Sequence, residues 1–414
     1  MKRYLLFVAI LTSFNVVAQN RMTPELLWKV KRVSALGISK DKQYLVYKVS
    51  TPDVGNNSFN SSKYYVNITK GEVRPINNPD SLLSDPTLSA DGKFKLSDES
   101  VKIKNIIGSD IYPDLPKSNA YVFESLNNRH WDTWEDGAFD HVFLTEVKNP
   151  SNKIDLLKNE PYDCPTKPFG GSEDYVWSAD GKTVVYVTKK KFGTEYAIST
   201  NTDLYAYDVA SGKTSNLTEG MMGYDINPSF NQFNQLAWMS MRRDGYEADK
   251  QDLYVWNGVS KMNLTAQRDD IHVEGYKWSD DGKKIFFYAP IDGTLQLFEV
   301  SYPGLTKMMP MIRQITKGNF DINGIVGQSG NQIIVSRTDM NHAPELYAVN
   351  IDDGSMNQLT HANDDFYNNI QLSKIEKRMV KTSDNKKMLC WVIYPPGFDP
   401  NKKYPTLLYC QGGP

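Results

Sequence analysis

A short acidic and aromatic segment near residue 130 holds the side chains best suited to chemistry. The candidate residues are Glu124, Trp131, Asp132, Trp134, Glu135 and Asp136. Carboxylates hold a cationic group by charge-assisted hydrogen bonds, and indole rings supply an apolar wall beside it. We therefore predict that this segment binds a cationic group of a substrate. The alternative is a hairpin at a sheet edge, with both tryptophans packed inward and the acids in solvent.

Other kinds of catalytic chemistry have no matching residues in this sequence. A Gly-x-Ser-x-Gly nucleophile elbow, which exposes a serine on a strand-to-helix turn, occurs nowhere in it. The nearest match is Gly327-Gln328-Ser329-Gly330. The cysteines and histidines show no spacing typical of a zinc site. We expect no metal, no cofactor and neither a catalytic nucleophile nor a triad histidine in these residues.

Composition and charge are those of a globular, β-rich protein. Hydrophobic residues make up 40% of the 414 residues, charged residues 23%, and the formal charge is -2. Because there is no basic excess, we expect no binding to nucleic acid or to anionic lipid. Aromatic residues make up 12%, with 24 Tyr and 8 Trp, which favours strands over helices.

The first 18 residues have the pattern of an export signal. Lys2 and Arg3 precede an apolar run from Tyr4 to Val17, and small residues end at Ala18. We predict a signal peptide at residues 1–18 and a periplasmic or secreted protein. A membrane anchor is the alternative, but the run is too short to span a bilayer comfortably. No later apolar run is longer, so we expect no membrane span after cleavage.

A repeat of about 50 residues organises most of the chain. Its motif, Ser-x-Asp-Gly-Lys, is clear at three places and weaker at three more. The six copies lie near residues 36, 88, 177, 228, 278 and 327. The second half of the unit is a strand such as Asp203–Asp208, followed by Asn-Leu-Thr or Gln-Leu-Thr. Asp-Gly and Ser-Gly supply the positive φ of tight hairpins, so each unit predicts a four-stranded antiparallel blade.

Blades of this kind cannot bury both faces alone, so several must stack around an axis. We expect an all-β fold: a propeller over residues 22–370 with seven blades (six to eight) and its Asp-Gly turns at the blade rims. A short helix from Pro24 to about Lys31 should precede it. The interval from Asp91 to Asp180 exceeds one repeat by about 40 residues. An insertion at about 119–141, which holds the acidic and aromatic segment, should therefore project from a blade.

Residues 374–414 depart from the repeat. Ile375 to Lys381 and Lys387 to Tyr394 predict two strands, followed by a proline-rich loop. The apolar run Thr406 to Cys410 predicts a buried strand that ends at a Gly-Gly-Pro turn. Such a strand needs pairing on both edges. We expect residues 374–414 to be the incomplete start of a second domain, with the sequence stopping at its threshold.

Together the repeats and the tail resemble the prolyl oligopeptidase family of serine peptidases. In the tail, the resemblance rests on the motifs Pro395-Pro396-Gly397-Phe398-Asp399-Pro400, Lys402-Lys403-Tyr404-Pro405 and Gly412-Gly413-Pro414. The segment Arg129-His130-Trp131-Asp132 is similar to the dipeptidyl-peptidase V and acylaminoacyl-peptidase branch. The resemblance implies a C-terminal α/β-hydrolase domain with a Ser-Asp-His triad, capped by a propeller that filters substrates by size.

The resemblance further implies an exported serine exopeptidase that releases dipeptides or acyl-amino acids from oligopeptides. This chain would be its propeller, inactive alone, with the hydrolase domain and the oligopeptide as partners and a homodimer as one option. The insertion's acids would bind the free amino group of the peptide. The loop Gln411, Gly412 and Gly413 would contribute to the oxyanion hole, or would only make a turn.

Two other functions stay open at this point. One is a non-catalytic periplasmic binding propeller of the translocation-protein type, which would have no use for residues 375–414. The other is a polysaccharide-active propeller enzyme, which would need paired inward carboxylates.

Overall fold

The computed structural model describes residues 20–306 and 308–410. The predicted signal peptide, residues 1–18, and the predicted oxyanion loop, Gln411 to Gly413, lie outside the described residues. Within the described ranges, no helix has the length and apolar character needed to cross a membrane.

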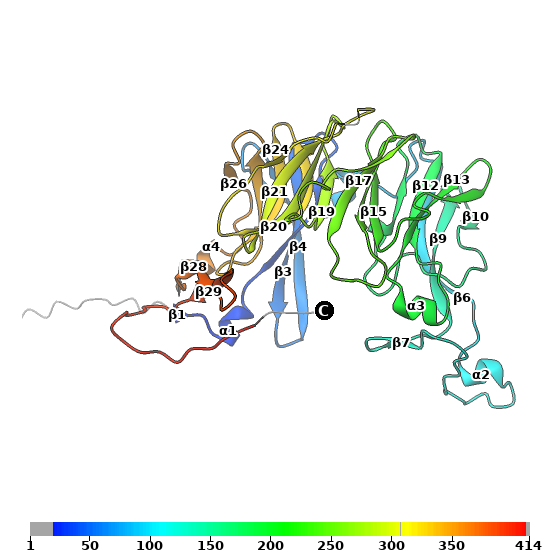
Figure 1. Cartoon of the computed structure of the whole chain (residues 1–414), viewed down its shortest axis with the longest axis horizontal. Helices are drawn as coiled ribbons and strands as arrows, with labels where there is room; N and C mark the ends of the chain where they lie inside the picture. The colour runs from blue at the N-terminus through cyan, green and yellow to red at the C-terminus, as the bar shows by residue number, and fades with distance from the viewer. Residues whose placement is uncertain (1–19, 307, 411–414) are drawn as a thin grey trace, which may run out of the picture.

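Six consecutive antiparallel sheets occupy residues 32–358 (Figure 1). Sheet 1 contains β2 (Arg32–Ile38), β3 (Tyr44–Asp53), β4 (Ser58–Asn67) and β5 (Val73–Pro75). Sheet 2 contains β6 (Phe94–Lys102), β9 (Ala138–Glu146) and β10 (Asn149–Asp155). Sheet 3 contains β11 (Tyr175–Trp177), β12 (Thr183–Thr188), β13 (Asp203–Asp208) and β14 (Lys213–Asn216).

The remaining three sheets have four strands each. Sheet 4 contains β15 (Asp225–Phe230), β16 (Leu236–Met241), β17 (Gln251–Trp256) and β18 (Lys261–Asn263). Sheet 5 contains β19 (Gly275–Trp278), β20 (Lys284–Ile291), β21 (Thr294–Ser301) and β22 (Ile312–Gln314). Sheet 6 contains β23 (Asp321–Ser329), β24 (Gln332–Thr338), β25 (Glu345–Asn350) and β26 (Met356–Gln358).

This arrangement confirms the predicted all-β propeller. Six sheets are found in the described chain, which lies within the predicted range of six to eight blades and is one fewer than the preferred seven. Five of them have four strands. Sheet 2 has three, and the isolated bridge between Leu88 and Lys95 stands where its first strand would be.

The threonine of the Asn-Leu-Thr or Gln-Leu-Thr segment explains why the second half of the repeat recurs. In sheets 3 to 6 its hydroxyl donates to one of the first three residues of the third strand, as Thr218 does to Asp203 over 2.9 Å and Thr265 to Asp252 over 2.6 Å. The same oxygen accepts the N–H of the next residue, Leu204 or Leu253. The Asn-Leu-Thr segment therefore recurs together with the Asp-Leu-Tyr segment, because the threonine of the first bonds to the aspartate side chain and the leucine N–H of the second.

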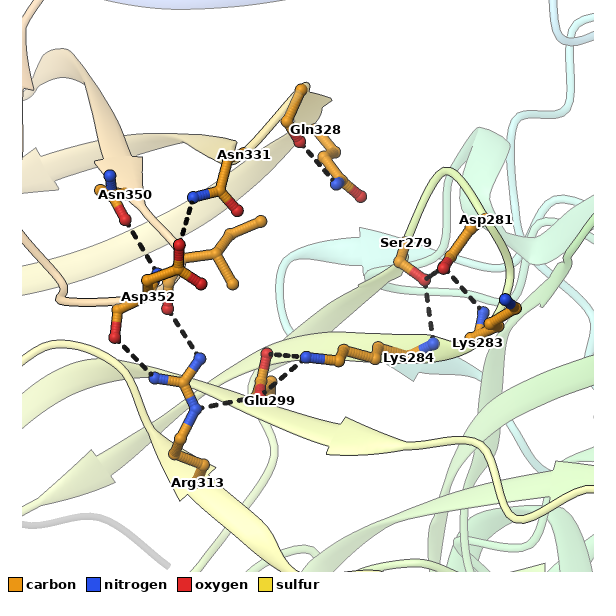
Figure 2. Close-up of polar contacts among 12 residues, drawn as sticks. Ser279, Asp281, Lys283, Lys284, Glu299, Arg313, Gln328, Asn331, Asn350 and Asp352 are labelled. Atoms are coloured by element: carbon orange, nitrogen blue, oxygen red, sulfur yellow. Dashed lines mark hydrogen bonds and ion pairs between the residues drawn. The ribbon is translucent and has the colours of Figure 1, made fainter.

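The Ser-x-Asp-Gly-Lys motif forms a turn that bonds to itself (Figure 2). Ser279 Oγ donates to Asp281 Oδ1 over 2.7 Å and accepts the N–H of Lys284 over 2.9 Å. Asp281 also accepts the N–H of Lys283 over 3.0 Å, and Gly282 has φ of +67°. Because these bonds are local, the motif specifies the turn wherever it occurs.

These turns lie near the propeller axis, so the prediction that they sit at the blade rims is wrong. Lys42, in the turn of sheet 1, pairs with Asp280, in the turn of sheet 5, over 2.9 Å. The Asp280 N–H also donates to Gln328 of sheet 6 over 2.8 Å. Sheets 1 and 5 are not neighbours, so their turns can meet only close to the axis. The first strand of each sheet is therefore the innermost one.

Apolar cores join five of the six pairs of neighbouring sheets. Clusters of buried side chains connect sheets 2 and 3, 3 and 4, 4 and 5, 5 and 6, and 6 and 1. In the described chain no comparable cluster connects sheets 1 and 2. There, residues 58–63 of β4 and Asp98, Glu99 and Ser100 of β6 are exposed.

The insertion leaves sheet 2 earlier than predicted. Lys102 of β6 pairs with Ala138 of β9, so the excursion runs from 103 to 137 rather than from about 119 to 141. It contains α2 (Gly108–Ile111), β7 (Arg129–His130) and β8 (Thr133–Trp134). Residues 138–141 of the predicted insertion lie within β9.

The tail lies at the same end of the propeller as the insertion (Figure 1). It contains α4 (Asp364–Tyr367), β27 (Ile370–Gln371), β28 (Ile375–Lys381) and β29 (Lys387–Ile393). β27 pairs with β1 (Asn20–Arg21), and α1 (Pro24–Leu27) is shorter than the predicted helix. We call this end the tail-side face. Short elements elsewhere are η1 (Pro79–Ser81), η2 (Ser172–Asp174) and α3 (Thr194–Ile198).

The β28–β29 hairpin confirms two predicted strands, whereas the third prediction is wrong. Residues 406–410 form no strand, and Leu407 and Leu408 are 97% and 88% exposed. An apolar run becomes a buried strand only when neighbouring strands satisfy its backbone and cover its side chains. No described strand pairs with this run.

Candidate functional site

The tip of the β7–β8 hairpin presents an exposed aromatic pair on the tail-side face. Trp131 is 70% exposed, Phe169 is 72% exposed, and their ring centroids lie 5.0 Å apart in an edge-to-face arrangement. Trp131 has φ of +52°, a left-handed conformation that costs a bulky residue about 1–2 kcal/mol. A strained and exposed tryptophan is a candidate binding residue.

Trp134 has a different environment, closer to the packed alternative. Its ring lies 6.0 Å from Tyr121 and 6.1 Å from Phe123, and the Arg129 guanidinium lies 5.3 Å above it. This stack ties the hairpin to the rest of the insertion. Trp134 is still 49% exposed, but its contacts with these rings anchor the hairpin that carries Trp131.

Among the predicted acids, Glu135 differs in being half-buried and without a side-chain partner among the described residues. It is half-buried, and its N–H donates to Asn128 O over 3.0 Å. Its carboxylate makes no hydrogen bond or ion pair with any described residue. Burial raises its pKa, the nearby Lys167 opposes that shift, and the charge of Asp163 adds to it. An ionised carboxylate in this state is stabilised by any cation that reaches it.

Near Glu135, the carboxylate of Asp163 is already paired with a cation. Lys167 Nζ lies 2.9 Å from Asp163 and 3.8 Å from Asp140. Asp163 is buried, accepts the N–H of Asp140 over 2.8 Å, and has its pKa raised mainly by burial. The Lys167 ammonium is thus shared by Asp163 and Asp140. It forms no ion pair with Glu135.

Tyr196 of α3 forms a further wall of this site. Burial raises the pKa of its hydroxyl, and the negative charges of Asp163 and Glu135 raise it more. Lys104 lies beside the same region, with Nζ 4.9 Å from the Phe192 ring centroid. The site therefore combines the Glu135 and Asp163 carboxylates with Lys167 and the aromatic side chain of Tyr196.

The other predicted acids are placed differently. Asp136 accepts the N–H of Ala138 over 2.9 Å, and its carbonyl accepts a hydrogen bond from Lys102 over 2.8 Å, so it shapes the turn into β9. Asp132 lies at the exposed hairpin tip and Glu124 is exposed in the preceding loop. The assignment of all these residues to binding stays a prediction.

Four residues of the site were missed by sequence reasoning: Asp163, Lys167, Phe169 and Tyr196. The spacing of Asp163 and Lys167, four residues apart in a proline-rich loop, was the one signal available. Nothing in the sequence connects that loop or α3 to the insertion. Across residues 20–306 and 308–410, no group of three or more His, Cys, Asp or Glu side chains is placed to hold a metal ion.

Comparisons with known proteins agree with this architecture. No family model matches the chain. It is 34% identical over 441 aligned positions to dipeptidyl-peptidase 5 of Porphyromonas gingivalis, covering 95% of this chain and 63% of that protein. Dipeptidyl-peptidase 5 of Porphyromonas endodontalis is 33% identical with the same coverage. The chain thus spans about 63% of the length of these relatives.

Solved structures show the same fold. An acylaminoacyl peptidase superposes with a TM-score of 0.66 and 14% identity over 92% of this chain and 60% of its own. Acylaminoacyl peptidase of Pyrococcus horikoshii superposes with a TM-score of 0.64 and 13% identity, over 89% of this chain and 59% of its own. The resemblance drawn from repeats and tail is therefore confirmed: the chain is a homologue of the proteins named dipeptidyl-peptidase 5.

Proposed function

We propose that this chain is the propeller part of an exported serine exopeptidase that releases dipeptides from oligopeptides. In this proposal the insertion binds the free amino group of the substrate. The observation that carries it is the half-buried carboxylate of Glu135, which makes no hydrogen bond or ion pair with any described residue and lies near Tyr196. The homology to dipeptidyl-peptidase 5 supports the choice of a peptide as the ligand.

The chemistry of the amino end matches this site. An α-amino group has an ordinary pKa of about 7.7–8.0, so it is largely protonated at neutral pH. Its ammonium would pair with Glu135 and lower the raised pKa of that carboxyl. The Trp131–Phe169 pair would pack against the first side chain of the peptide. An N-acylated substrate lacks the charge and would gain nothing from Glu135.

The β28–β29 hairpin would be the start of the hydrolase domain. It rests on the turn between β20 and β21: a Cβ at Gly293 would lie 2.2 Å from Leu389, and Lys377 lies 3.7 Å from Asp292. The nucleophile, the triad and the oxyanion loop at Gln411 to Gly413 belong to that domain in this proposal. Export through residues 1–18 to the periplasm or the medium is part of the same proposal.

The test uses the full-length gene product and two substrate series, dipeptidyl-naphthylamides with a free or an acetylated amino end. Glu135→Gln should lower kcat/KM for the free-amine series roughly 5- to 150-fold, the scale of one charge-assisted hydrogen bond. The acetylated series should be unchanged. The control is Glu146→Gln, at the other end of β9, where Asn152 already donates to the acid.

Two results would count against the proposal. One is an equal loss on both series, which would make Glu135 a structural residue. The other is no change on either. A wild-type preference for the acetylated series would instead favour release of acyl-amino acids.

A further inference from the structure

Lys277 is a lysine inside the propeller that has no role in the packing of the sheets described above or in the proposed function. It lies on β19, the innermost strand of sheet 5. Its neighbours Tyr276 and Trp278 face sheet 4: Tyr276 donates to Ala237 O over 2.7 Å and Trp278 to Ser229 O over 3.3 Å. Because side chains alternate along a strand, Lys277 points to the opposite side.

That opposite side is the face of sheet 5 that packs on sheet 6, because Phe286, paired with Lys277, joins the apolar cluster of those two sheets. Lys277 lies at the innermost edge of this face and is exposed, so its side chain borders the central channel. The turn that follows β19 meets the turns of sheets 1 and 6 through Asp280, as described above, so β19 ends at the axis. Innermost strands of a propeller surround its channel. Lys277 is two residues before Ser279 of that turn, near the end of the channel that is farther from the tail-side face.

The surroundings of Lys277 are apolar, and the nearest acid on its row is already neutralised. Lys277 lies opposite Phe286, which is fully buried, and Phe286 lies opposite Glu299. Glu299 is held by Lys284 over 3.1 Å and by Arg313 over 2.9 Å (Figure 2). Phe286 therefore separates Lys277 from the Glu299 carboxylate.

Lys277 itself makes no hydrogen bond or ion pair with any described residue. Burial lowers its pKa, and no neighbouring charge contributes to that shift. Its side chain is nevertheless accessible to solvent. A lowered pKa together with solvent access is expected for a lysine side chain that points into a water-filled space enclosed by protein. An unpaired ammonium in such a space binds an anion with little competition from other charges.

We propose that Lys277 binds a carboxylate of a peptide that enters the channel from the tail-side face. The carboxylate is either the peptide's free carboxy end or an acidic side chain. This inference rests on the proposed function, because it takes an oligopeptide as the ligand. It adds a second anchor for the part of the substrate that lies beyond the released dipeptide.

The position of Lys277 predicts a dependence on peptide length. From Phe286, opposite Lys277, β20 continues for five residues to Ile291 at the tail-side end. At about 3.3 Å per residue, Lys277 lies roughly 17 Å inside the channel. A peptide needs about five residues beyond the released dipeptide to reach it. Shorter peptides should not distinguish a carboxylate from an amide at their carboxy end.

The experiment compares peptides of three to ten residues that end in a free carboxylate or in an amide. With the full-length enzyme, kcat/KM should favour the carboxylate about five- to tenfold only for peptides of about seven residues or more. Lys277→Met should remove this difference, and Lys283→Met, an exposed lysine of the following turn, should keep it. Amidated peptides with one internal glutamate separate a side-chain carboxylate from the carboxy end.

Two further measurements make the outcome decisive. Titration calorimetry of the 414-residue chain with an octapeptide acid and its amide tests binding without catalysis, and thermal unfolding checks that Lys277→Met is folded. Equal binding of acid and amide, or a difference that survives Lys277→Met, overturns the inference. A carboxylate preference without any free-amine preference would sink the proposed function and leave this inference standing.

Discussion

The contact between sheets 3 and 4 and the gap between sheets 1 and 2 are built from different sequences. At the first, Leu204, Leu236 and Trp238 are fully buried, and every residue of β16 is buried. At the second, residues 58–63 of β4 are all exposed. Five apolar contacts therefore hold the ring of sheets together, and the ring is weakest between sheets 1 and 2.

The cause lies in the strand sequences. β16 carries Leu-Ala-Trp-Met-Ser-Met, whereas β4 begins Ser-Phe-Asn-Ser-Ser-Lys. Burying one large apolar side chain contributes about 1.5–3 kcal/mol, and serine or lysine offers no such gain. Local opening should therefore begin between sheets 1 and 2.

The largest expected effect comes from Trp238, the largest fully buried side chain at the contact of sheets 3 and 4. Trp238→Ala should lower the free energy of unfolding by about 3–5 kcal/mol, because it leaves a cavity and removes the hydrogen bond to Asp225. Phe59→Ala, at a position of β4 that is 46% exposed, is the control and should cost less than about 1 kcal/mol. Denaturant unfolding measures both. Similar losses would mean that the two regions are equally well packed.

Asp225 makes the same contact sensitive to pH. Burial raises its pKa to about 7, so the folded protein keeps a proton that the unfolded chain releases near pH 4. The stability it contributes is full below pH 4 and is lost as pH rises toward 7, roughly 2–4 kcal/mol in all. Asp225→Asn should flatten this part of the pH profile while Trp238 keeps an acceptor. A variant that retains the wild-type slope between pH 4 and 8 would assign the effect to other groups.

Hydrogen exchange tests the comparison without any substitution. Amides of β4 and β6 should open with a free energy about 1–3 kcal/mol lower than those of β12 and β16, that is, roughly 5- to 150-fold faster exchange. Equal protection in both regions would show that sheets 1 and 2 are held by contacts other than a buried apolar core.

The parts of this structure that were predictable from sequence are the local ones. The Ser279 turn and the Thr218 link bond within a single unit, so the repeat alone specifies them. The insertion's true start depends on the pairing of Lys102 with Ala138, 36 residues away, which no local pattern encodes. Glu135 was found by its chemical type, but Lys167 reaches the site only through folding.

The smallest expected effect is at Lys42, whose ion pair with Asp280 ties the turn of sheet 1 to sheet 5. Both side chains are well exposed, at 49% and 41%, so solvent screens the pair. In a double-mutant cycle, Lys42→Ala and Asp280→Ala should couple by less than about 0.5 kcal/mol, and less still in 1 M salt. The Lys42 carbonyl, which accepts from Ser329 Oγ over 2.7 Å, is kept in both variants. A coupling above about 2 kcal/mol would contradict the comparison, because one surface pair would then hold sheet 1 in the ring more strongly than solvent screening allows.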